Sequence, residues 1–92
     1  MKSRFGGRDR ISTKAKLSGE LTILGRVMAA TRERAGIKQS DLAARLDLPA
    51  SYLSKIENGT RRLDVIELIQ IADAMNVDAG EIVREVAREL GE

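Results

Sequence analysis

Residues 39–59 read QSDLAARLDLPASYLSKIENG and contain two short segments with apolar residues at helical spacing. About four residues separate the two segments, and they include Asp47 and Pro49. Asp tolerates a left-handed turn, while Pro lacks a backbone N–H and suits the first turn of a helix. Two short helices at this separation predict a helix-turn-helix. The first of them is expected over about residues 39–46.

The second helix of the pair, predicted from residue 49 or 50 to Gly59, has two unlike faces. Leu53 and Ile56 form an apolar face, and glycine at the end allows the positive φ of a helix C-terminus. The opposite face is polar and most of its side chains are small: Ala50, Ser51, Ser54 and Lys55. Such a face fits a major groove about 12 Å wide. A basic loop follows, so the acid Glu57 raises the question of what its carboxylate faces.

The chain before this pair divides into two parts. Residues 1–17 are rich in Lys, Arg, Gly and Ser and lack apolar periodicity, so a flexible basic arm is expected there. A helix is predicted to follow from about Leu21, with Ser18 as its N-cap and Gly36 as its stop. The buried stripe of this helix is expected to contain Leu24, Val27, Met28, Thr31 and Ala35.

Two more helices are predicted after the pair. Asp64 opens the fourth helix, and Glu67 stands three residues later, as in a capping box. Asp78 and Glu81 repeat this signal before the fifth helix. The apolar positions are Val65, Leu68, Ile69, Ala72 and Met75 on the fourth helix and Ile82, Val86 and Leu90 on the fifth. Residues 18–92 therefore read as one compact, all-α domain of five helices.

The composition limits the possible functions. A chain of 92 residues with two aromatics, Phe5 and Tyr52, favours one domain of packed helices over a β-sandwich. Because there is neither Cys nor His, disulfides, thiolate zinc sites and imidazole bases are excluded, and we expect no enzyme and no cofactor. No apolar run approaches the roughly 18 residues of a membrane span. No secretory signal is recognisable, so a cytoplasmic location is expected.

The charge is distributed unevenly along the chain. Residues 1–19 carry six Lys or Arg against one Asp, and residues 20–62 carry eight against five Asp or Glu. Residues 63–92 reverse the balance, with two Arg against eight acids. This asymmetry indicates a polyanionic partner for one end of the molecule. A solvated surface with segregated charges is the alternative.

The spacing and identity of several residues resemble the Cro/C1-type (XRE-like) helix-turn-helix family of phage and bacterial repressors. These residues are Gln39, Leu42-Ala43, Leu53, Ile56-Glu57-Asn58-Gly59 and Ile71-Ala72, and the resemblance extends from about Leu24 to Ile82. It implies a lambda-repressor-like DNA-binding domain. It also implies an ion pair between Arg32 and Glu57, which would turn Glu57 back into the domain and away from a polyanion.

The resemblance further implies which residues contact DNA. Bases would be read by Ala50, Ser51, Ser54 and Lys55. Phosphates would be contacted by Lys38, Gln39, Tyr52, Asn58, Thr60, Arg61 and Arg62. Tyr52 has an alternative role, which is lateral packing on the second helix. The chain departs from the family pattern at Ala50, where a glutamine that reads adenine is common, so the operator sequence stays open.

The acidic end carries surplus apolar residues. A homodimer interface is predicted from Ile66, Val83, Val86, Ala87 and Leu90, with closure of the domain's own core as the alternative. The family resemblance implies a sequence-specific regulator of transcription that binds double-stranded DNA, and we expect a repressor that binds a palindromic operator as a dimer. An antitoxin that also binds a toxin protein, or a restriction–modification controller, are the alternatives. The basic arm either follows a DNA groove or is a solvating tail.

Overall fold

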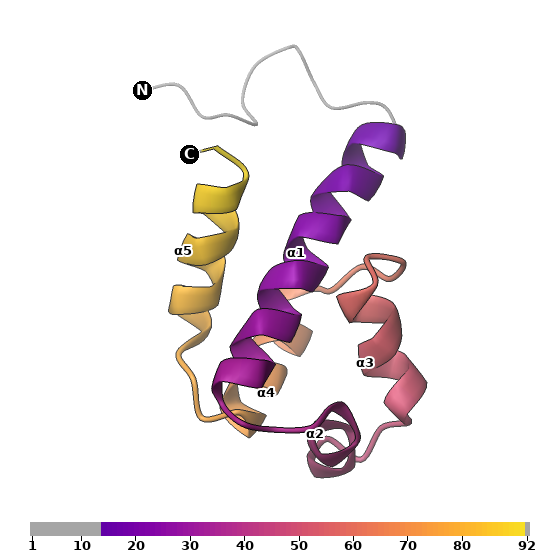
Figure 1. The fold of residues 1–92 in the computed structure, drawn as a ribbon, viewed down its shortest axis with the longest axis vertical. Helices are drawn as coiled ribbons and strands as arrows, with labels where there is room; N and C mark the ends of the chain where they lie inside the picture. The colour runs from indigo at the N-terminus through magenta and orange to yellow at the C-terminus, as the bar shows by residue number, and fades with distance from the viewer. Residues whose placement is uncertain (1–13, 92) are drawn as a thin grey trace.

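The computed structural model describes residues 14–91, and within that range it contains five helices and no strand. They are α1 (Lys14–Arg34), α2 (Gln39–Arg45), α3 (Ala50–Glu57), α4 (Val65–Ala74) and α5 (Ala79–Glu89). The long helix α1 lies between α3 on one side and α5 on the other, α2 packs on α3, and α4 packs on α5 (Figure 1). The predicted all-α class with five helices is confirmed.

One hydrophobic core joins all five helices. Its buried members are Val27, Met28, Leu42, Ala43, Leu53, Ile56, Leu68, Ile71, Ala72, Met75 and Ile82. Burial of a Leu, Ile or Met side chain contributes roughly 1.5–3 kcal/mol, so this core supplies most of the driving force for folding. Thr31 is also buried, and its hydroxyl donates to the Val27 carbonyl at 2.8 Å, which satisfies the polar group within α1.

Short turns with left-handed residues connect the helices. Gly36 ends the α1 segment at φ 73°, Asp47 turns the chain between α2 and α3 at φ 58°, and Gly59 follows α3 at φ 77°. The predicted left-handed turn at Asp47 and the positive φ at Gly59 are confirmed. At the start of α4, Asp64 and Glu67 form the predicted capping box.

A close backbone approach fixes α1 against the end of α3. A Cβ added to Gly25 would lie 2.6 Å from the Ile56 carbonyl oxygen and 2.5 Å from that of Glu57. A Cβ added to Gly59 would lie 2.8 Å from the Cα of Thr22. Both glycines are therefore required by the packing, because any larger side chain would force the two elements apart.

Three expectations about helix ends are wrong. Helix α1 begins at Lys14, so Ser18 is an interior position and not its N-cap. The segment Lys-Ala-Lys-Leu at residues 14–17 consists of strong helix formers, which explains the earlier start. The remainder of the predicted arm, residues 1–13, lies outside the described residues. The Asp78 side chain caps α5 by accepting from the Gly80 N–H at 3.2 Å, whereas the Glu81 N–H donates to the Asp78 backbone carbonyl at 3.0 Å, so the predicted side-chain bond to Glu81 is not made.

The predicted apolar face of α4 is partly wrong. Val65 is 61% exposed and Ile69 is 49% exposed, whereas Ile71 is fully buried. Ile69 lies about 100° around the helix from Leu68, which places it outside the buried stripe. Val65 lies in the first turn, beyond the end of the core. Ala35 is exposed as well, because α1 ends at the residue before it.

Candidate nucleic-acid interface

Helices α2 and α3 form the predicted pair, and α3 presents one face to solvent. Leu53 and Ile56 are each 1% exposed and hold α3 on the core. Ala50, Ser51 and Lys55 are exposed, while Ser54 is partly buried. Three of the four residues predicted to read bases therefore lie free on one side of the helix. Because two of these three are small, the backbone of α3 can approach a partner surface closely.

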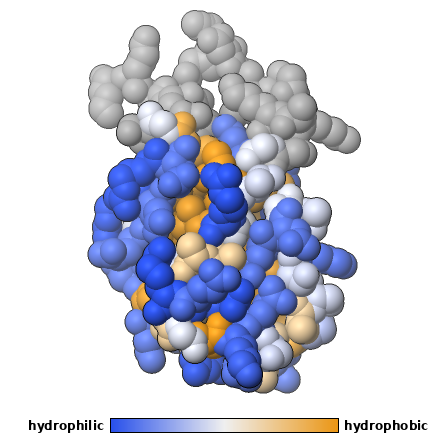
Figure 2. All heavy atoms as spheres, in the orientation of Figure 1, coloured by the Kyte–Doolittle hydropathy of each residue, from blue (hydrophilic) through white to orange (hydrophobic). Residues whose placement is uncertain are grey.

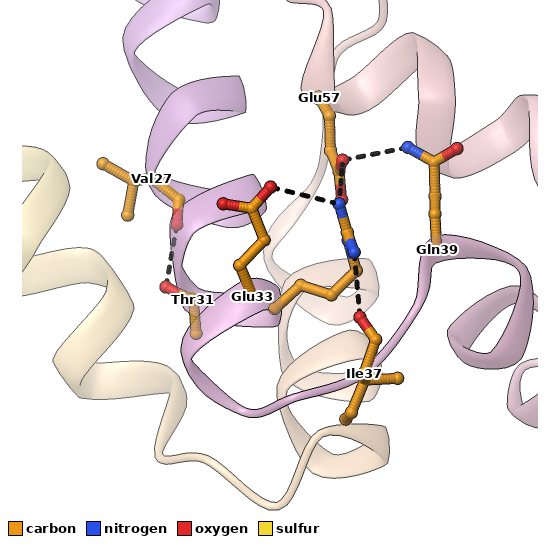
Figure 3. Close-up of polar contacts among 7 residues, drawn as sticks. Val27, Thr31, Glu33, Ile37, Gln39 and Glu57 are labelled. Atoms are coloured by element: carbon orange, nitrogen blue, oxygen red, sulfur yellow. Dashed lines mark hydrogen bonds and ion pairs between the residues drawn. The ribbon is translucent and has the colours of Figure 1, made fainter.

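The carboxylate of Glu57 faces into the domain, as Figure 3 shows. Arg32 donates to it twice, from Nε to Oε2 at 2.8 Å and from Nη2 to Oε1 at 3.1 Å. Gln39 adds a donor from Nε2 to Oε1 at 2.9 Å. Arg32 also donates from Nη1 to the Ile37 carbonyl at 2.8 Å. The predicted ion pair is therefore present, and it ties the ends of α1 and α3 to the start of α2.

This ion pair is largely buried. The side chains of Arg32 and Glu57 keep only 12% and 9% of their exposure, and Glu33 lies 3.9 Å from the Arg32 guanidinium at its outer edge. The hydrogen bonds to Glu57 raise the pKa of Arg32 above its ordinary value. Removal of one member of such a pair strands the other charge in a poorly hydrated place. Glu57, the acid that precedes the basic loop, therefore serves to hold the end of α3 on α1.

The residues predicted to contact phosphates fall into two groups. Lys38, Asn58, Thr60 and Arg62 are exposed at the start of α2 and in the loop after α3. Gln39 is partly buried, and its side-chain amide is engaged with Glu57. The Thr60 hydroxyl donates to the Lys55 carbonyl at 3.1 Å, which orders the loop on the end of α3. Lys38 takes the N-cap position of α2 without a capping side chain.

Tyr52 and Arg61 meet a partner that sequence reasoning missed. The Tyr52 hydroxyl donates to Oε2 of Glu67 at 3.0 Å, and the Arg61 guanidinium lies over the tyrosine ring at 4.4 Å. Arg61 also pairs with Glu67, Nη2 to Oε2, at 3.1 Å. Burial, followed by the bond to Glu67, raises the pKa of Tyr52. The capping-box pattern of Asp64 and Glu67 was the one signal in the sequence that indicated the position of Glu67 at the start of α4.

The predicted dimer residues divide by exposure. Ile66 and Val83 are 60% and 49% exposed, whereas Val86, Ala87 and Leu90 are partly buried. Val86 packs against the core, as the alternative interpretation of this strip required. Sequence reasoning missed Val65 and Ile69, which lie exposed on α4 together with Ile66.

A second surface feature is a groove between α1 and α5. Figure 2 shows that hydrophilic residues cover most of the face on which α1 and α5 lie side by side, with a strip of hydrophobic surface near its centre. The groove, of about 400 Å³, is lined by Arg26, Val27, Ala29, Ala30, Glu33, Glu57, Glu85 and Glu89. Its carboxylates are each paired with an arginine, since Glu57 and Glu33 also bind Arg32. Ion pairs at 3.1 Å (Arg34 to Glu85) and 3.5 Å (Arg26 to Glu89) close it across the two helices.

The comparison with known families decides what this arrangement is. The family of helix-turn-helix domains matches residues 28–82, more than half of the chain. The chain belongs to the Cro/C1-type helix-turn-helix family. The chain is accordingly a DNA-binding transcriptional regulator. Within residues 14–91 of the chain, no helix is both long enough and apolar enough to cross a membrane.

Three relatives of this helix-turn-helix protein illustrate the likeness. An uncharacterised HTH-type transcriptional regulator from Sinorhizobium fredii is 34% identical over 61 residues, which is 66% of this chain and 79% of that protein. The solved structure of an XRE-family like protein from Pseudomonas syringae pv. tomato is 34% identical, covers 83% of this chain and 93% of its own, and has a TM-score of 0.71. The restriction–modification controller protein C.AhdI from Aeromonas hydrophila is 25% identical, with 70% and 97% covered and a TM-score of 0.65.

Proposed function

We propose that the chain regulates transcription as a homodimer that places two copies of α3 in successive major grooves of a palindromic operator. The observation that carries this proposal is the exposed small-residue face of α3 on a helix that is anchored from behind. Leu53 and Ile56 anchor it by burial, and the Arg32–Glu57 pair anchors its C-terminal end. A helix held in this way needs no rearrangement to enter the groove.

The exposed residues of α3 and its surroundings divide into two roles in this proposal. Lys55 donates to guanine O6 and N7, and Ala50 contacts a thymine methyl, so these positions read sequence together with Ser51 and Ser54. Lys38, Gln39, Asn58, Thr60, Arg61 and Arg62 hold phosphates, which fixes the register of α3 but carries no sequence information. Gln39 does so through the start of α2, where free backbone N–H groups favour an anion.

The dimer is formed through α4 and α5 in this proposal. Ile66 and Val83 are exposed there, and Val65 and Ile69 extend the same apolar surface. The C-terminal part of the chain is acidic, so it faces away from DNA, and a twofold contact on it leaves both copies of α3 directed to the duplex. The two copies must then lie about 34 Å apart, one turn of B-DNA.

A restriction–modification controller is the second candidate function. The likeness to the controller protein C.AhdI favours it, because the helix arrangement of that protein is matched over 97% of its length by 70% of this chain. Neighbouring restriction and methyltransferase genes would support this role. The antitoxin alternative stays a prediction, and an adjacent toxin gene would be the observation in its favour. Repression remains the expected direction of control.

Selection of bound sequences from a random duplex pool tests the proposal. We expect an enriched palindrome with half-sites about one helical turn apart and a log–log salt slope of about −0.9 for each neutralised phosphate. Arg62→Ala should weaken binding to all duplexes equally, while Arg26→Ala removes the same charge from an exposed position on α1, away from the proposed dimer surface, and serves as the control. A pool without enrichment, or a flat salt response, contradicts DNA recognition by α3.

The dimer is tested separately by light scattering. Val83→Asp places a charge in the apolar surface and should give a folded monomer that has lost most of its operator affinity. Leu90→Asp should act in the same direction. A parent protein that stays monomeric at high micromolar concentration and still binds a single half-site tightly contradicts the dimer.

A further inference from the structure

Glu67 is the centre of a polar cluster that joins α3, the loop after it and α4. Its Oε2 accepts from the Tyr52 hydroxyl at 3.0 Å and from Arg61 Nη2 at 3.1 Å. Its Oε1 accepts from the Asp64 N–H at 2.9 Å and from Arg61 Nη1 at 3.4 Å. Arg61 Nη1 also donates to the carbonyl of Arg62 at 2.8 Å. The guanidinium is therefore held on both sides in the free protein.

In this cluster the Glu67 carboxylate neutralises the positive charge of Arg61, at the edge of the proposed DNA-facing surface. The hydrogen bonds from Arg61 lower the pKa of Glu67 to about 2, which shows that the pairing favours the ionised carboxylate. The same bonds raise the pKa of Arg61. Arg61 follows α3 by only four residues, where a phosphate-facing loop begins, and yet its charge is already paired.

The pair is also exposed enough to be exchanged. The side chains of Arg61 and Glu67 keep 36% and 26% of their exposure. Water screens such a surface pair, so it is weak, whereas a duplex presents one negative charge for each ~1.7 Å of its axis. The guanidinium lies over the Tyr52 ring, which offers a platform on which Arg61 can turn without leaving the surface.

We propose that Arg61 is bound to the Glu67 carboxylate in the free protein. When the protein binds DNA, a phosphate replaces this carboxylate on Arg61. This inference rests on the proposed DNA binding and adds a residue that sets its strength. Each binding event breaks the Arg61–Glu67 contact and leaves an ionised carboxylate near the backbone. Glu67 therefore lowers the affinity for every duplex alike and leaves the base preference unchanged.

Glu67→Gln tests the inference, because the amide oxygen of glutamine can still accept from the Asp64 N–H, while the charge and the second acceptor oxygen, which binds Tyr52 and Arg61, are removed. Fluorescence anisotropy should show binding about two- to fivefold tighter, on the selected operator and on an unrelated duplex alike. In an Arg61→Ala background, the same change should have a much smaller effect. Glu81→Gln removes an equal charge from an exposed pair with Arg84 on α5, and it serves as the control.

A second measurement uses the parent sequence. Tyr52 is the single tyrosine of the chain, so 3-fluorotyrosine labels this cluster alone. Its ¹⁹F resonance should shift when DNA binds to the parent and should shift much less in Arg61→Ala. An unchanged resonance at saturating DNA, or unchanged or weaker binding by Glu67→Gln, overturns the exchange. A parent that binds no duplex would instead overturn the proposed function itself.

Discussion

Two carboxylates flank α3, and they differ mainly in how far they are removed from water. Glu57 ends α3, is 9% exposed and is bound by Arg32, whereas Glu67 lies in the first turn of α4, is 26% exposed and is bound by Arg61. A poorly hydrated pair is strongly coupled, while a hydrated pair is screened. We therefore interpret the Glu57 pair as part of the fold and the Glu67 pair as a contact that DNA exchanges.

The largest expected effect is on the buried pair. Arg32→Ala strands the Glu57 carboxylate and should lower the free energy of unfolding by about 3–5 kcal/mol. Arg61→Ala, which removes the partner of the hydrated carboxylate, should lower it much less. Urea denaturation of both variants measures the difference. Equal losses in the two variants would show that burial does not separate the pairs.

The backbone contact beneath Glu57 gives the next largest effect. Gly25→Ala places a methyl group against the carbonyl oxygens of Ile56 and Glu57, where a Cβ would meet them at 2.6 and 2.5 Å. Overpacking of this kind costs about 1–3 kcal/mol. Gly19→Ala is the control, since a Cβ there meets nothing within 4 Å. Thermal melting should therefore lower the Tm of Gly25→Ala alone, and equal Tm values would contradict the close contact.

The smallest expected effect is a change of folding stability at low pH. The pKa of Glu67 is about 2 in the folded protein, below its ordinary value of 4.5, so its contribution to stability is present above about pH 4.5. That contribution is lost as the pH falls through about 2. The stability difference between the parent and Glu67→Gln should hence shrink over this window. A difference that stays constant from pH 6 to pH 2 would mean that Glu67 is not held by Arg61.

The two carboxylates also show how much of the site the sequence could predict. The Arg32–Glu57 pair followed from a family resemblance, because both residues occupy fixed positions on helices whose register the core determines. The cluster around Glu67 did not follow, because it depends on the directions of three side chains from three different elements. Only the capping signal of Asp64 indicated where Glu67 would stand.

The fold was predictable where periodicity and turn residues agreed. Residues 39–59 met both conditions, and α2, the turn at Asp47 and α3 lie where they were expected. The apolar run at the start of α4 could not be resolved in this way, since Val65 and Ile69 match a helical stripe but extend past the core. The start of α1 was missed because residues 14–17 continue a segment that lacks apolar periodicity.

Selection of bound sequences with Lys55→Ala beside Arg62→Ala tests most directly whether α3 reads DNA. Lys55 is exposed on the outer face of α3, and Arg62 is exposed in the loop behind it. Lys55→Ala should relax the base preference at one position of each half-site, at a cost of about 1–3 kcal/mol. Arg62→Ala should weaken binding evenly and leave the preference intact. An unchanged preference in Lys55→Ala would contradict reading by α3.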